Sequence, residues 1–164
     1  MELIGQIIND LIDDNTSLHS ALLKTKVLAS RIGNENLLKW TNSELEGYDF
    51  VEDLPDYRKN IWNALKGNVI NGYMKYTDIE IPTVGLDEDF EHSLRYTNFQ
   101  ESITSLENLT KEKGTLTSPI RAEVSQMIEI KKKKMGNPYL GIISCNKIIS
   151  RANIIAILTS VRSK

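Results

Sequence analysis

The sequence predicts an α+β fold, with an N-terminal layer of short helices, a small antiparallel sheet and further helices that include a C-terminal one. Apolar side chains recur at helical spacing over the first 47 residues, which indicates amphipathic helices. Residues 58–82 are instead rich in β-branched and aromatic residues and surround an Asn-Gly pair, a combination typical of a β-hairpin. No internal repeat or Ser/Gly linker interrupts the 164 residues, so we expect a single domain over residues 1–164.

The first 47 residues are expected to form three short helices joined by tight turns. Residues 3–12 carry apolar side chains at the i, i+3, i+4 and i+7 positions of one helix face. A second helix is expected to end at Gly33, because glycine readily adopts the left-handed conformation at a helix C-terminus. Asn34 is the expected N-cap of the third helix, and Gly47 is its expected end.

The centre of the chain is expected to form a hairpin. Residues 58–70 and 73–82 have strand-like composition and flank Asn71-Gly72. Both of these turn residues accept positive φ, as a type I′ turn requires. Gly67 interrupts the first strand and is a candidate position for a β-bulge.

The second half of the chain returns to helices, with one further strand. Asn98 and Ser118 are expected to cap two of the helices, the second because Pro119 suits the first helical position. The expected helices are 87–95, one that starts at Asn98 and ends at Gly114, one that starts at Ser118-Pro119 and ends at Gly136, and one that starts at Ser150; the expected strand is 139–149.

Composition and charge are those of an ordinary globular chain, with 40% hydrophobic and 26% charged residues. The net charge is −2, so no overall field attracts nucleic acid, and we do not expect a nucleic-acid partner. No apolar stretch approaches the ~20 residues that a transmembrane helix needs. Because the N-terminus also lacks a signal-peptide pattern, we expect a cytoplasmic location.

The sequence predicts no cofactor and no catalytic, cofactor-binding or metal-ligating residues. Cys145 is the only cysteine, and its isoleucine neighbours favour a buried thiol over a nucleophile. His19 and His92 have no cysteine or histidine at zinc-binding spacing. A glycine-rich phosphate loop is also missing, and the question of a small-molecule ligand stays open.

Several motifs follow one another at a spacing that is typical of one protein family. L-A-S-R-I-G-N-E-N-L-L-K-W begins at Leu28, E-L-E-G-Y at Glu44 and L-P-D-Y-R at Leu54. A Leu-Glu pair at Glu107 and the apolar stretch 148–162 follow downstream. Together these motifs resemble the AbiTii domain of bacterial abortive-infection proteins, with the strongest similarity over residues 26–58.

The resemblance implies a role in defence against phage, and it carries over no catalytic residues. In that family the closing helix usually continues, so we expect residues 1–164 to be the N-terminal part of a longer protein. We interpret the domain as acting in oligomerisation, recognition or regulation, with no catalysis of its own. Its expected partner is either a second copy of itself or another protein of the defence system.

The motif-bearing loop also contains the candidate interaction site. Acidic and aromatic residues alternate over residues 44–57, which is more typical of a recognition loop than of a catalytic cleft. Packing of the helical layer on the hairpin is the alternative explanation for the aromatic residues. The candidate interaction residues are Trp40, Tyr48, Phe50, Asp56, Tyr57 and Arg58.

A metal-dependent nuclease is the alternative function. Pro55-Asp56 and Glu129-Ile130-Lys131 are similar to a PD…(D/E)xK site, in which two carboxylates converge on a divalent cation. Glu129 and Lys131 fall on an expected helix, where positions i and i+2 point to different sides, so the geometry disfavours this site. A sensor of a nucleotide second messenger ranks last, because the chain lacks a phosphate-binding loop.

Two charged groups remain, and each has an ordinary explanation beside a functional one. Asp10, Asp13 and Asp14 share one helix face, which suits either solvent exposure or a hydrated cation. The lysine run 131–134 falls near a helix C-terminus, where it suits either a solvated helix end or a phosphate or lipid contact. In both cases the solvent-exposed explanation is preferred.

Overall fold

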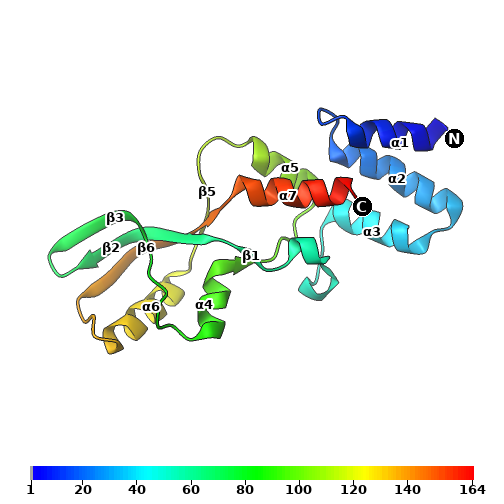
Figure 1. The fold of residues 1–164 in the computed structure, drawn as a ribbon. Helices are drawn as coiled ribbons and strands as arrows, with labels where there is room; N and C mark the ends of the chain where they lie inside the picture. The colour runs from blue at the N-terminus through cyan, green and yellow to red at the C-terminus, as the bar shows by residue number, and fades with distance from the viewer. Residues whose placement is uncertain (1) are drawn as a thin grey trace. The chain divides into compact units, whose positions relative to one another are not determined.

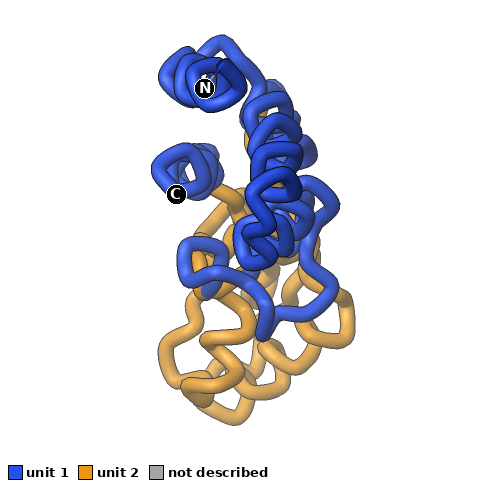
Figure 2. The backbone as a smooth tube through the Cα atoms, turned by 90° about the vertical axis from the view of Figure 1, so that its right-hand side faces the viewer, with its two compact units in different colours: residues 1–59, 98–113, 151–164 blue, residues 60–97, 114–150 orange. Residues whose placement is uncertain are grey.

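The computed structural model describes residues 2–164, which divide into two compact units (Figures 1 and 2). Unit 1 consists of the chain up to Lys59 together with residues 98–113 and 151–164. Unit 2 consists of residues 60–97 and 114–150. Neither unit is one continuous stretch, and the single domain expected over residues 1–164 stays a prediction.

Unit 1 is helical, and its first helices follow from their capping residues. The Ser17 side chain accepts a hydrogen bond from the Ser20 N–H, and the Asn34 side chain accepts one from the Leu37 N–H. Gly33 has a φ of 68°, which ends the second helix as expected. The elements are α1 (Glu2–Ile12), α2 (Leu18–Ile32), α3 (Glu35–Glu46), the 3-10 turns η1 (Val51–Asp53) and η2 (Asp56–Arg58), α5 (Ile103–Lys111) and α7 (Arg151–Arg162).

The core of unit 1 joins helices that are far apart in the sequence. Leu18 and Leu22 of α2 cluster with Ile103 of α5 and Val161 of α7. Two side chains also close helix ends. The Glu107 carboxylate accepts the Leu18 N–H at 2.7 Å, and the Arg162 guanidinium donates to backbone carbonyls at the end of α1 and just beyond it. Both charges have the sign that the helix dipole favours at that end.

Unit 2 contains two antiparallel sheets and two helices. The larger sheet has the strand order β3-β2-β6-β5, and the smaller pairs β1 with β4. The strands are β1 (Ile61–Trp62), β2 (Ala64–Asn71), β3 (Met74–Glu80), β4 (Tyr96–Thr97), β5 (Leu116–Pro119) and β6 (Leu140–Ile149), and the helices are α4 (Glu88–Arg95) and α6 (Ala122–Lys134).

The β2–β3 hairpin is present, with a turn placed one residue later than expected. Asn71 pairs with Met74, so the turn residues are Gly72 and Tyr73, and Gly72 has a φ of 63°. The expected irregularity at Gly67 is confirmed, since the register shifts between Gly67 and Val69. A Cβ on Gly67 would lie 1.9 Å from a backbone oxygen of β6, so the close strand approach requires glycine there.

The core of unit 2 lies between the larger sheet and its two helices, which cover the same side of that sheet (Figure 1). Leu65 and Val69 of β2 are buried together with Leu94 of α4 and Ile128 of α6. Cys145 of β6 belongs to this cluster, and burial raises the pKa of its thiol to about 11. The prediction of a buried thiol is therefore confirmed.

Two expected helix starts are wrong, in each case because a tertiary contact competes with the local signal. Ser118-Pro119 lies in β5, where Thr117 and Ser118 pair with β6. The helix expected from Asn98 begins only at Ile103, with Ser102 as its N-cap. The residues between are irregular, and the Phe99 N–H donates to the Arg58 carbonyl instead of to a helix. Within residues 2–164, none of the helices combines the length and apolar character that a membrane span needs.

Candidate functional site

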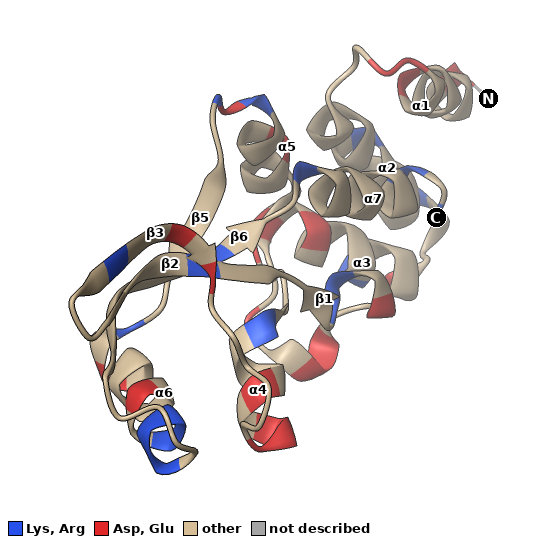
Figure 3. Ribbon diagram, turned by 60° about the vertical axis from the view of Figure 1, so that its left-hand side comes forward, with Lys and Arg blue, Asp and Glu red and all other residues tan. Residues whose placement is uncertain are grey.

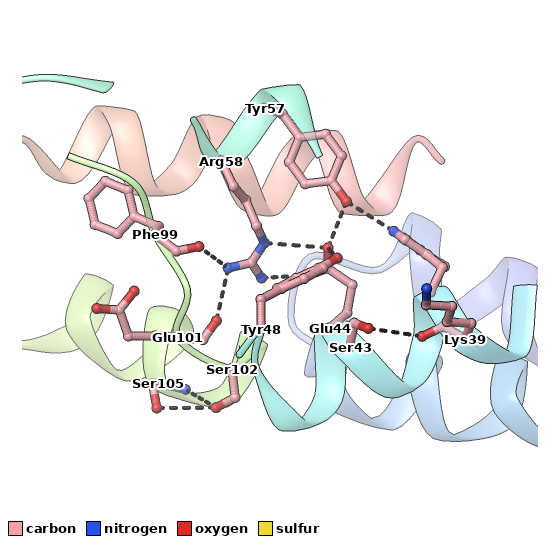
Figure 4. Close-up of polar contacts among 11 residues, drawn as sticks. Lys39, Ser43, Glu44, Tyr48, Tyr57, Arg58, Phe99, Glu101, Ser102 and Ser105 are labelled. Carbon is pink, nitrogen blue, oxygen red and sulfur yellow. Dashed lines mark hydrogen bonds and ion pairs between the residues drawn. The ribbon is translucent and has the colours of Figure 1, made fainter. Parts of the chain in front are cut away.

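Three of the candidate interaction residues, Tyr48, Tyr57 and Arg58, surround one carboxylate, that of Glu44 (Figure 4). Glu44 lies on α3, and the other residues lie on α3 or on the loop that follows it. Gly47 ends α3 with a φ of 96°, and a Cβ there would lie 2.9 Å from the Gln100 carbonyl oxygen. Glycine therefore lets the loop turn back closely against the segment before α5.

Glu44 and Arg58 form a buried ion pair. The distance from Arg58 Nη2 to Glu44 Oε2 is 2.5 Å, and neither side chain has any exposed surface. Arg58 Nη1 donates to the carbonyls of Phe99 and Glu101 at 3.0 and 2.8 Å. The guanidinium thus connects η2 to α3 and to the segment before α5 (Figure 4). A buried charge is tolerated when its partner and its remaining hydrogen bonds are supplied in this way.

Two tyrosines complete the surroundings of Glu44. The hydroxyl groups of Tyr48 and Tyr57 donate to Glu44 Oε1 at 2.8 and 2.6 Å, and Trp40 Nε1 donates to the Tyr57 hydroxyl at 3.0 Å. Burial, together with the Glu44 carboxylate, raises the pKa of both phenols well above their usual range. Both tyrosines therefore stay protonated and act as donors over the physiological pH range.

The predicted interaction residues differ in exposure. Arg58 and Tyr48 are buried, whereas Trp40 and Tyr57 are partly buried and hydrogen-bonded to each other. Phe50 is 65% exposed, and Asp56 at the start of η2 is exposed as well. A partner therefore has access to Phe50 and Asp56, while the buried members fix the conformation of the loop that carries them.

A surface hollow of about 390 Å³ lies between α3 and the loop. Trp40, Tyr48 and Phe50 line it together with residues of both charges. The remaining lining residues are Asn36, Lys39, Ser43, Gly47, Asp49, Asp53 and Pro55. We call this surface the α3 hollow. This part of the site is concave and open to solvent.

The residues of the alternative nuclease site have other contacts. Asp56 belongs to unit 1, whereas Glu129 belongs to α6 of unit 2, where its carboxylate accepts the Ile142 N–H. Lys131 pairs with Asp87 at 2.5 Å. Within residues 2–164, no group of three or more His, Cys, Asp or Glu side chains is placed to hold a metal ion.

The helix face expected to carry three aspartates is wrong, because α1 ends at Ile12 and Asp13 and Asp14 lie beyond it, and two of the three carboxylates have partners. Asp10 pairs with Lys24 at 2.7 Å, and the Asp13 carboxylate accepts hydrogen bonds from Asn15 and Thr16. These hydrogen bonds, that of the Asn15 backbone N–H first, lower the pKa of Asp13. Two residues of the lysine run also have partners. Lys131 pairs with Asp87, and Lys132 Nζ donates to the Val84 carbonyl at 2.6 Å. The expectation that the whole run is exposed to solvent therefore does not hold for these two lysines.

Sequence reasoning located these motif residues but missed what several of them do. The sequence pattern places Glu44 among the acidic residues of the loop and Glu107 in a Leu-Glu pair, and it assigns neither of them a partner. For Glu44, the spacing of residues was a usable signal. Glu44 lies on the last turn of α3, and Tyr48 follows four residues later, so their side chains fall on the same side of the chain and can form a hydrogen bond. The partner of Glu107 is 89 residues away, a separation that no local pattern reveals.

Comparison with known proteins gives one match. A model of the family described as AbiTii matches residues 2–164, essentially the whole chain. No match was found among curated proteins or among solved structures.

Proposed function

The chain belongs to the AbiTii family, and on that premise we propose that it takes part in abortive infection as a recognition and self-association module with no catalysis of its own. The family supports the anti-phage role. The module function rests on the α3 hollow and on Phe50 at its edge.

Exposure of Phe50 is the observation that carries the proposal. A phenylalanine that is 65% exposed loses favourable burial in the isolated chain, and it regains that burial in a contact. Val51 beside it is 38% exposed, so the loop presents two apolar side chains next to each other. Aromatic anchors of this kind commonly dominate the binding energy of protein interfaces.

The buried network supports the proposal in a second way, because it holds the loop in one conformation. Arg58 and Glu44 connect the end of the loop to α3. Gln100 fixes its beginning, since the Gln100 side chain donates to the carbonyls of Tyr48 and Asp49 at 3.1 Å. A surface that is ordered before binding loses less conformational entropy when a partner docks.

A phage-protection assay with Phe50→Ser tests the proposal. Bacteria expressing the protein are challenged with phage, and plaque counts are compared between the native chain and the variant. We expect Phe50→Ser to lose protection while its thermal unfolding stays unchanged, because the side chain is mostly in solvent. Tyr73→Ser is the matched control, because Tyr73 is a fully exposed aromatic residue in the β2–β3 turn. Full protection by Phe50→Ser would contradict the proposal.

The absence of catalysis is tested separately. Purified protein is incubated with DNA and with RNA in the presence of Mg²⁺, and we expect no cleavage. Cleavage that disappears in both Asp56→Ala and Glu129→Ala would support the nuclease alternative instead.

A further inference from the structure

The α3 hollow has an acidic border. A second hollow of about 380 Å³ adjoins it on α3 and shares Lys39, Ser43, Gly47 and Asp49 with it. Four exposed carboxylates line the two hollows, against the single ammonium of Lys39. These carboxylates belong to Glu35, Glu46, Asp49 and Asp53.

Acidic and aromatic groups together favour a cationic ligand. The faces of Trp and Phe rings attract a cation, and nearby carboxylates strengthen that attraction. A nucleotide phosphate would be repelled by the same carboxylates, so the nucleotide-sensor hypothesis does not fit this surface. Asn42 lines the second hollow, and its side-chain oxygen is buried without a hydrogen-bond partner among residues 2–164, which leaves an acceptor unsatisfied there.

The chain itself carries a complementary surface at the end of α6 (Figure 3). Lys131 and Lys132 are held by Asp87 and by the Val84 carbonyl, which fixes this helix end. Lys133 and Lys134 are exposed. Two apolar side chains flank them, Ile130 at 53% and Met135 at 52% exposure, so the lysines belong to a mixed basic and apolar surface.

We propose that Lys133 and Lys134 of one copy of this chain dock into the acidic α3 hollow of a second copy. This inference rests on the self-association part of the proposed function and adds the two surfaces that make it. The apolar side chains beside the lysines provide contacts for Phe50, and the carboxylates provide the attraction that selects the lysine end. Because the two surfaces differ, each copy offers one surface of each kind, so the contact can close into a reciprocal dimer or a larger ring, or continue as an open chain.

Charge reversal on each surface tests the docking. One variant carries Asp49→Lys and Asp53→Lys, and the other carries Lys133→Glu and Lys134→Glu. Sedimentation velocity is measured on the native full chain and on each variant over a concentration series at low and high salt. We expect the native chain to associate, to dissociate as salt screens the attraction, and to lose association in each variant alone.

A mixture of the two variants is the decisive test of whether these two surfaces bind each other. In an equimolar mixture, the native lysine end of the first variant meets the native acidic hollow of the second, and the two reversed surfaces are also complementary. Association is therefore expected to return only in the mixture. A Lys111→Glu, Lys113→Glu variant reverses two other exposed lysines and is expected to associate like the native chain.

The outcomes separate this inference from the proposed function. A native chain that stays monomeric, or a Lys133→Glu, Lys134→Glu variant that associates normally, overturns the docking. If Phe50→Ser still abolishes phage protection in that case, the recognition proposal survives without it. If the mixture associates but Phe50→Ser protects fully, the docking is correct and the proposed role of Phe50 is wrong.

Discussion

Glu44 and Arg58 lie fourteen residues apart and are joined by an ion pair that solvent does not reach, with Nη2 and Oε2 2.5 Å apart. Both belong to the motifs that link the chain to its family. Because they lie inside unit 1 and not on its surface, they support the conformation of the loop that follows α3. The exposed residues of that loop are then the ones available to a partner.

Removing one member of this pair is expected to be costly. Arg58→Met leaves the Glu44 charge buried without a counterion, so we expect the free energy of unfolding in urea to fall by about 3–5 kcal/mol. Replacing both residues, as in Glu44→Met with Arg58→Met, is expected to cost less than the sum of the two single changes. Glu80→Gln is the control, because that carboxylate is 66% exposed and its pairing with Arg95 is worth at most about 1 kcal/mol. A loss below about 1 kcal/mol in Arg58→Met would contradict the role of the pair.

Alkaline pH is expected to destabilise unit 1 through its tyrosines. Burial beside Glu44 raises the pKa of Tyr57 and Tyr48 above the unfolded value of about 10. The folded chain therefore holds these protons more tightly, so the stabilisation is complete below pH ~10 and is lost as the pH rises further. Melting temperatures from neutral to strongly alkaline pH should fall steeply for the native chain and less steeply for Tyr57→Phe. Tyr73→Phe, in an exposed turn, should follow the native curve.

Gly67 and Gly5 are expected to respond to alanine in opposite directions. A Cβ on Gly67 meets the Ser144 carbonyl oxygen at 1.9 Å, so Gly67→Ala should force β2 and β6 apart and cost about 1–3 kcal/mol or more. A Cβ on Gly5 meets nothing within 4 Å, and alanine suits α1 better than glycine. Gly5→Ala should therefore stabilise the chain by about 0.5–1 kcal/mol. Equal effects of the two changes in urea unfolding would show that the close approach of β2 and β6 is wrong.

The two units are expected to unfold together, as one domain. Each unit contains a tryptophan, Trp40 in unit 1 and Trp62 in unit 2, and the chain has no others. Trp62→Phe then leaves a fluorescent probe of unit 1, and Trp40→Phe leaves a probe of unit 2. Neither unit is a continuous segment, so unfolding of one unit frees the chain ends that hold the segments of the other unit together. In each variant, the fluorescence transition should therefore coincide with the circular dichroism transition. Two separate transitions within one variant would establish two independent domains.

Local signals predicted most of the fold, and they failed where distant residues compete. Gly33 and Asn34 act on residues within one helical turn, so their effects are readable from the sequence. Ser118-Pro119 has an equally good local signal for a helix start, but pairing with β6 holds it in a strand. The Asn98 signal failed for the same reason, because the Phe99 N–H is engaged by the distant Arg58 carbonyl and not by a helix. Long-range pairing outweighs a helix cap worth about 1 kcal/mol.

The sequence could mark the loop that contains the candidate residues, but it could not show which of these residues are buried and which are exposed. Alternating acids and aromatics marked the loop, and the family-like spacing marked Glu44, Tyr48 and Arg58. Which of them become buried depends on α5 and the segment before it, some 40 residues downstream. A pattern of residue types contains no information on that contact, so Phe50 and Arg58 looked equally available from the sequence.

The contact between Arg162 and the end of α1 can form only late in synthesis, because its two partners lie near opposite ends of residues 2–164. The Arg162 guanidinium binds the Asp10 carbonyl across 152 residues, and Val161 beside it completes the core around α2. At about 5–20 residues per second, a ribosome needs roughly 8–30 s between making these two partners. During that interval α1 and α2 have emerged without the residues that close their core. A nascent chain therefore has an incomplete unit 1 until α7 is made, because the core around α2 lacks Val161 until then.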